Sequence, residues 1–137
     1  MDREVIAQKL ESLRRCVDRV QMRCPEDPAR LAVDQDAQDI VVLNLTRAVQ
    51  LCVDISAHIV SRLGVPPPDT MGQGFDELAR AGVITPDLAL RMKKSVGFRN
   101  IAVHNYREID WATVHAIAFR HLDDFRAFAR AVITTPL

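Results

Sequence analysis

Aromatic residues and glycines are scarce in this chain of 137 residues, which has five Phe, one Tyr, one Trp and five Gly. A core with so few aromatic rings must be mostly aliphatic, and aliphatic cores suit the packing of helices. The glycines form no phosphate-binding loop, because Gly72-Gln73-Gly74 is too short and wrongly placed for a dinucleotide-binding turn. Neither a GxSxG nor an HExxH pattern occurs. These absences exclude the common signatures of dinucleotide-binding enzymes, serine hydrolases and zinc proteases.

The chain also lacks net charge, since 18 basic residues balance 18 acidic ones. The charge of the whole molecule therefore does not drive it onto nucleic acid, and RNA binding would need a local patch. Such a patch is present between Asp87 and Glu108, where no acidic residue occurs and the basic residues are Arg91, Lys93, Lys94, Arg99 and Arg107. The alternative interpretation is an ordinary solvated helix face. A phosphate-binding patch would give a salt-dependent affinity.

Cysteines are few and odd in number: Cys16, Cys24 and Cys52 form no CxxC pair. The chain begins with charged residues instead of a signal peptide, and no apolar run approaches the roughly 20 residues of a membrane span. We therefore expect a cytoplasmic protein with reduced thiols. The histidines outside the motif described below have no His or Cys neighbour at metal-ligand spacing. We expect neither a metal site nor a cofactor.

Apolar residues recur at helical spacing along most of the chain, and no stretch alternates with period two over a convincing length. The first helix is predicted over about 3–23, with Ile6, Leu10, Leu13, Val17 and Val20 on one face. Aspartate or threonine before proline marks two further helix starts, at Asp27-Pro28 and at Thr85-Pro86. The other expected helices are 28–63 with a break near Asp34, a short one within 70–82, one from 86 through the motif, and one over 111–133 capped by Asp110. This pattern predicts an all-α, antiparallel up-and-down bundle of four to five helices in a single domain, residues 1–137.

The second predicted helix is apolar around most of its circumference from Ile40 to Val60. A helix of this kind is covered by more than one partner. In so short a chain a second subunit is the economical source of that cover, so we expect a homodimer through this helix, and a larger assembly stays open. Three polar residues interrupt the helix: Asn44, Arg47 and Asp54. They either satisfy one another across the dimer or point toward a cleft, and a structural role is the favoured interpretation.

The eight residues from Arg99 to Tyr106 contain three side chains that could take part in catalysis: Arg99, His104 and the only tyrosine, Tyr106. Arginine is a permanent cation whose donor fork suits phosphate. Histidine exchanges a proton near neutral pH. A phenolic hydroxyl donates, accepts or is modified. A phosphate-binding group and a proton-transfer group are the minimum for cleaving a phosphodiester without a metal.

Arg, four residues, His, one residue, Tyr is similar to the signature of the HEPN superfamily of small helical ribonucleases. Gly97-Phe98-Arg99-Asn100 before the motif, the long helix from Leu43-Asn44 to His58-Ile59, and the chain length resemble the HepT-like toxins of that superfamily. The resemblance covers nearly the whole chain. It implies an RNA-cleaving toxin with a cognate MntA-like nucleotidyltransferase antitoxin as partner, and a motif displayed at a dimer interface.

RNA cleavage by transesterification is the hypothesis that follows: the ribose 2′-OH attacks the adjacent phosphate, so DNA would not be cut by this route. His104 would act as general base or acid, and Arg99 would hold the phosphate and offset its growing charge. Asn100 would orient the substrate or His104. On an ideal helix the side chains of Arg99 and His104 point about 140° apart. They converge only if the helix ends near His104 or a second copy completes the site.

Tyr106 has a separate role in the resembling family. The resemblance implies that the antitoxin transfers AMP from ATP onto this tyrosine, while the hydroxyl otherwise helps to bind or orient substrate. An attached nucleotide adds bulk and negative phosphate where the RNA backbone would lie. The modification would therefore silence the nuclease.

Two other functions are compatible with the same sequence. Small helical bundles also accompany nucleotidyltransferases as non-catalytic subunits that bind a substrate or nucleotide. A purely structural dimeric adaptor is the third interpretation, in which changes to the motif would be silent. Cleavage of RNA by purified protein in EDTA separates the first hypothesis from the other two.

Overall fold

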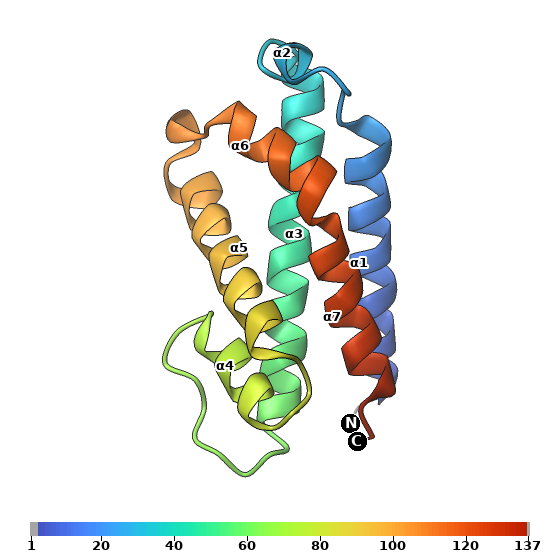
Figure 1. Cartoon of the computed structure of the whole chain (residues 1–137), viewed down its shortest axis with the longest axis vertical. Coiled ribbons are helices and arrows are strands. Elements are labelled where there is room, and N and C mark those ends of the chain that lie inside the picture. The colour runs from blue at the N-terminus through green and yellow to red at the C-terminus, as the bar shows by residue number, and fades with distance from the viewer. Residues whose placement is uncertain (1–2, 137) are drawn as a thin grey trace.

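The computed structural model describes residues 3–136, and within them every regular element is helical. Four long helices form the bundle, and Figure 1 shows them running alternately up and down its long axis. They are α1 (Arg3–Arg23), α3 (Gln35–Val60), α5 (Pro86–His104) and α7 (Leu122–Thr134). The shorter elements are α2 (Pro28–Leu31), α4 (Gln73–Arg80), η1 (Tyr106–Glu108), α6 (Trp111–Ala116) and η2 (Ile117–His121). The predicted all-α antiparallel bundle is confirmed.

Short polar side chains start the helices where the sequence indicates. The side chain of Asp27 accepts a hydrogen bond from the backbone N–H of Ala29, and Pro28 occupies the first helical position. Asp34 caps α3 in the same way, so the expected break in the second helix is confirmed as a separate turn, α2. The helix ends earlier than predicted, at Val60 instead of residue 63. Residues 61–64 form a turn that closes with Gly64 at φ +72°, a left-handed conformation that favours glycine.

α3 is the centre of the hydrophobic core, and it packs against α1, α4, α5 and α7. The predicted face of α1 is confirmed, because Ile6, Leu13, Val17 and Val20 are buried and Leu10 is partly buried. Two aromatic rings pack edge to face in the core: the centroids of Phe75 of α4 and Phe128 of α7 are 5.8 Å apart. The three cysteines are free and buried, and burial raises the pKa of the Cys52 thiol well above its usual value.

The buried polar side chains of α3 are hydrogen-bonded within the chain. Asn44 donates from Nδ2 to the carbonyl oxygen of Ile40 at 2.8 Å, and the Ser56 hydroxyl donates to the carbonyl oxygen of Cys52 at 2.9 Å. Gln38 donates to the carbonyl oxygen of Leu31 and so joins α3 to α2. Asp54 accepts from Gln50 and lies 3.8 Å from the Lys9 ammonium. These bonds agree with a structural role for Asn44 and Asp54. Both residues, together with Arg47, also line a hollow between α1 and α3, as the second interpretation expects.

α3 is also long and apolar enough to meet the length and hydropathy criteria for a membrane span. The expectation that no apolar run approaches this length is therefore wrong. About half of the qualifying window is buried inside the bundle. The core helix of a helical bundle meets the same criteria because its neighbours cover it on several sides.

The last predicted helix is interrupted. Residues 117–121 form a π-helical turn between α6 and α7, where the sequence predicts one continuous helix over 111–133. A π turn inserts extra backbone into a helix and shifts the faces that follow it. The predicted start is confirmed, since the Asp110 carboxylate accepts from the backbone N–H of Ala112.

Candidate functional site

The motif lies at the C-terminal end of α5, which packing and capping hold in place. Thr85 caps the helix by accepting from the backbone N–H of Leu88 at 3.1 Å. One face of α5 is buried through Leu88, Ala89, Met92, Val96 and Ala102. The helix ends at His104, where Asn105 leaves the helical conformation with φ −142° and ψ 55°. The helix therefore ends inside the motif, at His104, which is one of the two conditions named above for Arg99 and His104 to converge.

Arg99 is a half-buried cation with an incomplete set of partners. Its Nη1 donates to the Oδ1 atom of Asn100 at 3.2 Å. Its Nε is buried, and no acceptor for it is present within residues 3–136. A buried donor without a partner costs free energy, so the fold gains nothing from this N–H group.

His104 is the last residue of α5 and its side chain is exposed. Within the described part of the chain no hydrogen bond or ion pair joins its ring to another residue, and none joins it to Arg99. Asn100 is exposed beside Arg99, one helical turn before His104. A single chain therefore displays these side chains on neighbouring faces of α5 and does not bring Arg99 and His104 into contact.

Tyr106 is held against α3 by a hydrogen bond that joins residues far apart in the sequence. Its hydroxyl donates to the Oδ1 atom of Asp39 at 2.9 Å, and its ring meets Trp111 edge-on with centroids 6.0 Å apart. The side chain nonetheless stays 43% exposed. Partial burial, followed by the hydrogen bond and charge of Asp39, raises the pKa of Tyr106 to about 12. No sequence pattern indicated Asp39, because 67 residues separate it from Tyr106.

The basic patch predicted around the motif is partly neutralised. Arg91 pairs with Asp124 of α7 at 2.8 Å, and Lys93 pairs with Asp76 of α4 at 3.0 Å. Within residues 3–136, Lys94, Arg99 and Arg107 form no ion pair. The positive charge is therefore concentrated toward the motif end of α5 more than the sequence alone indicates.

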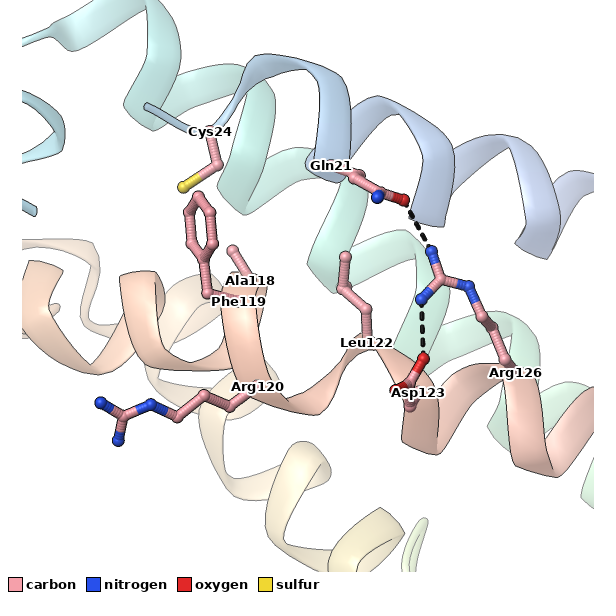
Figure 2. Close-up of a pocket in the computed structure, with 8 residues that line it drawn as sticks. All are labelled: Gln21, Cys24, Ala118, Phe119, Arg120, Leu122, Asp123 and Arg126. Carbon is pink, nitrogen blue, oxygen red and sulfur yellow. Dashed lines mark hydrogen bonds and ion pairs between the residues drawn. The ribbon is translucent and has the colours of Figure 1, made fainter. Parts of the chain in front are cut away.

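Several hollows lie away from the side chains of Arg99, His104 and Tyr106. One of about 570 Å³ lies between α1 and α3, and the residues that line it include Asn44, Arg47 and Asp54. A cavity of about 500 Å³ between α5 and the α6–α7 segment has an apolar floor from α3 that includes Leu45 and Val49. A smaller one, about 150 Å³, lies between α1 and the η2–α7 segment, and Figure 2 shows Arg126 crossing it. Arg126 donates there to Gln21 at 2.7 Å and to Asp123 at 2.9 Å. Because its guanidinium already has these partners, this residue joins α1 to α7. No group of three or more His, Cys, Asp or Glu side chains placed to hold a metal occurs within the described residues.

Comparisons with known proteins find the same family that the motif resembles. The sequence profile of the family described as Ribonuclease HepT-like matches residues 6–132. The chain is 36% identical to the mRNA nuclease HepT of Shewanella oneidensis over 91% of this chain and 93% of that protein. It is 35% identical to the tRNA nuclease HepT of Aphanizomenon flos-aquae, over 53% of this chain and 50% of that protein.

Solved structures give the same assignment. A tri-AMPylated HEPN toxin of Shewanella oneidensis, in complex with its MNT antitoxin, superposes with a TM-score of 0.90 at 34% identity, covering 98% of this chain and 100% of that one. The Bacillus subtilis protein YutE shares the fold at 14% identity, with a TM-score of 0.84 over 98% of this chain and 90% of that one. The matched residues 6–132 and the Shewanella relative together show that this chain belongs to the HepT-like ribonuclease family.

Proposed function

We propose that this chain is a metal-independent endoribonuclease toxin that acts in the cytoplasm as a homodimer of a single domain, residues 1–137. One observation carries the proposal: in a member of the HepT-like ribonuclease family, Arg99 and His104 lie in the last two turns of α5, and Tyr106 begins the short η1 turn that follows. The relatives that are named nucleases act on RNA, one on mRNA and one on tRNA. RNA is therefore the substrate class, and its particular target is a separate question.

The proposed chemistry uses the 2′-OH of the substrate as nucleophile. A ring nitrogen of His104 takes the proton from the 2′-OH as the 2′ oxygen bonds to phosphorus. The bond from phosphorus to the 5′ oxygen breaks, and a protonated imidazole returns a proton to that leaving oxygen. Arg99 holds a non-bridging phosphate oxygen through its guanidinium, which Asn100 orients by accepting from Nη1. The products are a 2′,3′-cyclic phosphate and a 5′ hydroxyl.

A second copy of the chain completes this site. Arg99 and His104 of one chain lie on different faces of α5, so one phosphodiester reaches both groups when two helix ends face each other across a cleft. Apolar surface suited to such an interface borders the motif: Leu43 of α3 and Val103 of α5 are each 49% exposed. Leu43 lies one helical turn from Asp39, which Tyr106 contacts. The interface would then include the helix predicted to need a partner.

The proposed control is AMP transfer onto Tyr106 by a cognate nucleotidyltransferase antitoxin. The Shewanella relative is a toxin that carries AMP and binds an MNT antitoxin. Tyr106 is 43% exposed and lies two residues after His104, so a partner can approach its side chain. The attached phosphate repels the RNA backbone and the adenosine occupies its space.

The test is RNA cleavage by purified, unmodified protein in EDTA. Arg99→Ala and His104→Ala should each lower the cleavage rate at least about 100-fold, the usual range for losing a proton-transfer or charge-stabilising group. Arg62→Ala and His58→Ala are matched controls. His58 lies in the last turn of α3 and Arg62 in the turn after it, whereas Tyr106 contacts Asp39 near the start of that helix. Single-stranded DNA of the same sequence should stay intact.

Three results would contradict the proposal. Wild-type protein that binds nucleotide but leaves RNA intact would identify a non-catalytic binding subunit of a nucleotidyltransferase complex. Cleavage that disappears in EDTA and returns with a divalent ion would contradict the metal-independent route. Wild-type cleavage by either motif variant would contradict the assignment of that residue.

A further inference from the structure

We propose that Asp39 is the positioning residue and proton acceptor for the modification of Tyr106. In this role Asp39 aims the tyrosine hydroxyl at the α-phosphate of ATP and takes up its proton as AMP is transferred. The inference rests on the proposed function, because it concerns how the same tyrosine is silenced. It adds a residue on a different helix that the motif does not contain.

The geometry singles out one acceptor for the phenolic proton. The hydroxyl of Tyr106 donates to Asp39 Oδ1 at 2.9 Å, and no other hydrogen bond of that hydroxyl occurs within residues 3–136. Asp39 lies on the second turn of α3, a helix fixed by its cap and by packing on four neighbouring helices. Trp111 at the start of α6 also contacts the ring, edge to face. The hydroxyl therefore points in a defined direction before any partner binds.

Asp39 is also chemically available. Within the described residues no Lys, Arg or His side chain forms an ion pair with it, so its charge is not neutralised by a neighbour. Among the described charged groups, Asp39 is the one that affects the Tyr106 hydroxyl through both a hydrogen bond and its charge.

The same surroundings explain why an acceptor is needed. Partial burial and Asp39 raise the pKa of Tyr106 to about 12, so only a very small fraction of its hydroxyl is ionised at neutral pH. An attacking phenol must then lose its proton during bond formation, which is general base catalysis. The ionised form of Tyr106 is too scarce at neutral pH to act as the main nucleophile.

The transfer balances with ATP as the AMP donor. The phenolic oxygen of Tyr106 bonds to the α-phosphorus, and the bond from that phosphorus to the oxygen bridging to the β-phosphate breaks. Pyrophosphate leaves with that electron pair. The phenolic proton moves to Asp39 and then to solvent, and the product is a tyrosyl phosphodiester with one negative charge.

The experiment measures AMP incorporation into Tyr106 by the cognate nucleotidyltransferase with ATP, using mass spectrometry, for wild type, Asp39→Asn and Asp39→Ala. Asp39→Asn keeps the size and a hydrogen-bond acceptor but cannot accept a proton. Its rate at pH 7 should fall about 100-fold. The wild-type rate should be nearly constant from pH 6 to 9, whereas the Asp39→Asn rate should rise about tenfold per pH unit, because the ionised phenol becomes the nucleophile. Asp36→Asn is the matched control, since Asp36 is an exposed carboxylate in the first turn of the same helix.

The outcomes separate this inference from the function on which it depends. If the wild-type chain takes up AMP and both Asp39→Asn and Asp39→Ala match its rate and pH profile, the Asp39 proposal is overturned and the proposed control of the toxin still stands. If Asp39→Asn modifies Tyr106 at a rate close to wild type and only Asp39→Ala is impaired, Asp39 orients the hydroxyl but does not accept its proton. That result overturns the proton-acceptor role. A wild-type chain that takes up no AMP overturns both. RNA cleavage by the wild type and by Arg99→Ala, measured in parallel, tests the nuclease without reference to Asp39.

Discussion

Polar side chains have hydrogen-bond partners in the interior of α3, whereas Arg99 and His104 at the exposed end of α5 lack some or all of theirs within the described residues. In α3, the buried Asn44 and Ser56 donate to the carbonyl oxygens one turn earlier, so burial leaves no donor unpaired. At the end of α5, Arg99 buries its Nε without an acceptor within residues 3–136, and the exposed His104 bonds to nothing in that range. Both helices are well packed, so the difference is local to a few side chains.

This difference separates polar groups that stabilise the fold from polar groups that remain unpaired and are candidates for binding a ligand. A buried donor bonded to its own helix contributes to stability and has no capacity left for substrate. A buried donor without a partner lowers stability and gains most when an anion arrives. The predictions below test whether stability resides in α3 and reactivity in the end of α5.

The largest effect on stability should come from the buried side of α3. Ile55 is fully buried there, and Ile55→Ala should lower the free energy of unfolding by about 2–5 kcal/mol because it removes apolar contacts and leaves a cavity. Urea denaturation measures the change. Leu43→Ala on the exposed side of the same helix is the control and should cost less than about 1 kcal/mol under conditions where the chain is monomeric. Equal losses of unfolding free energy at the two positions would show that the buried side of α3 contributes no more to stability than the exposed side.

Arg99→Leu should have effects of opposite sign on stability and activity. Leucine fills similar space without the unpaired Nε, so the free energy of unfolding should rise by about 1 kcal/mol. RNA cleavage should be lost because nothing holds the phosphate. Thermal denaturation and a cleavage assay on the same preparation check both signs. A variant less stable than wild type would mean that Arg99 stabilises the fold, and the comparison with α3 would fail.

Titration of the phenol should show how strongly Asp39 holds Tyr106. The chain has one tyrosine, so the absorbance change on ionisation reports Tyr106 alone. Wild type should titrate near pH 12 and Asp39→Asn at lower pH, because the variant lacks the charge that opposes ionisation. The native pKa lies above the value of 10.0 for a free tyrosine, so the contribution of this group to stability is present below pH 10 and decreases as pH rises toward 12. An unchanged titration in Asp39→Asn would show that burial alone shifts the group.

The smallest effect is expected at Ser56. Its hydroxyl bonds to a carbonyl oxygen of its own helix, so Ser56→Ala removes donor and side-chain polarity together and leaves no buried group unpaired. The free energy of unfolding should change by less than about 1 kcal/mol in urea denaturation. A loss of several kcal/mol would show that this hydroxyl has a role beyond its own helix.

The sequence predicted the helices well because their starts are local. Asp27-Pro28, Asp34, Thr85-Pro86 and Asp110 each satisfy backbone N–H groups within three residues, so capping is visible without tertiary structure. The π turn at residues 117–121 was missed because the apolar spacing of 111–133 fits a continuous helix, and the distortion comes from packing on other helices.

The candidate site was predictable only in part for the same reason. Arg99, His104 and Tyr106 are close in sequence, so a short pattern finds them. Asp39 reaches Tyr106 from another helix, and its position near the start of α3 also fits an ordinary acidic residue that favours a helix N-terminus. The acids that neutralise Arg91 and Lys93 come from α7 and α4 and were equally invisible.

The edge-on contact between Trp111 and Tyr106 gives this protein a built-in optical reporter. The chain contains one tryptophan, and its ring lies 6.0 Å from the one side chain proposed to receive the nucleotide. Indole emission responds to a change in its immediate neighbour, so attachment of adenylate and its removal can be followed in real time by intrinsic fluorescence, without a dye or a label.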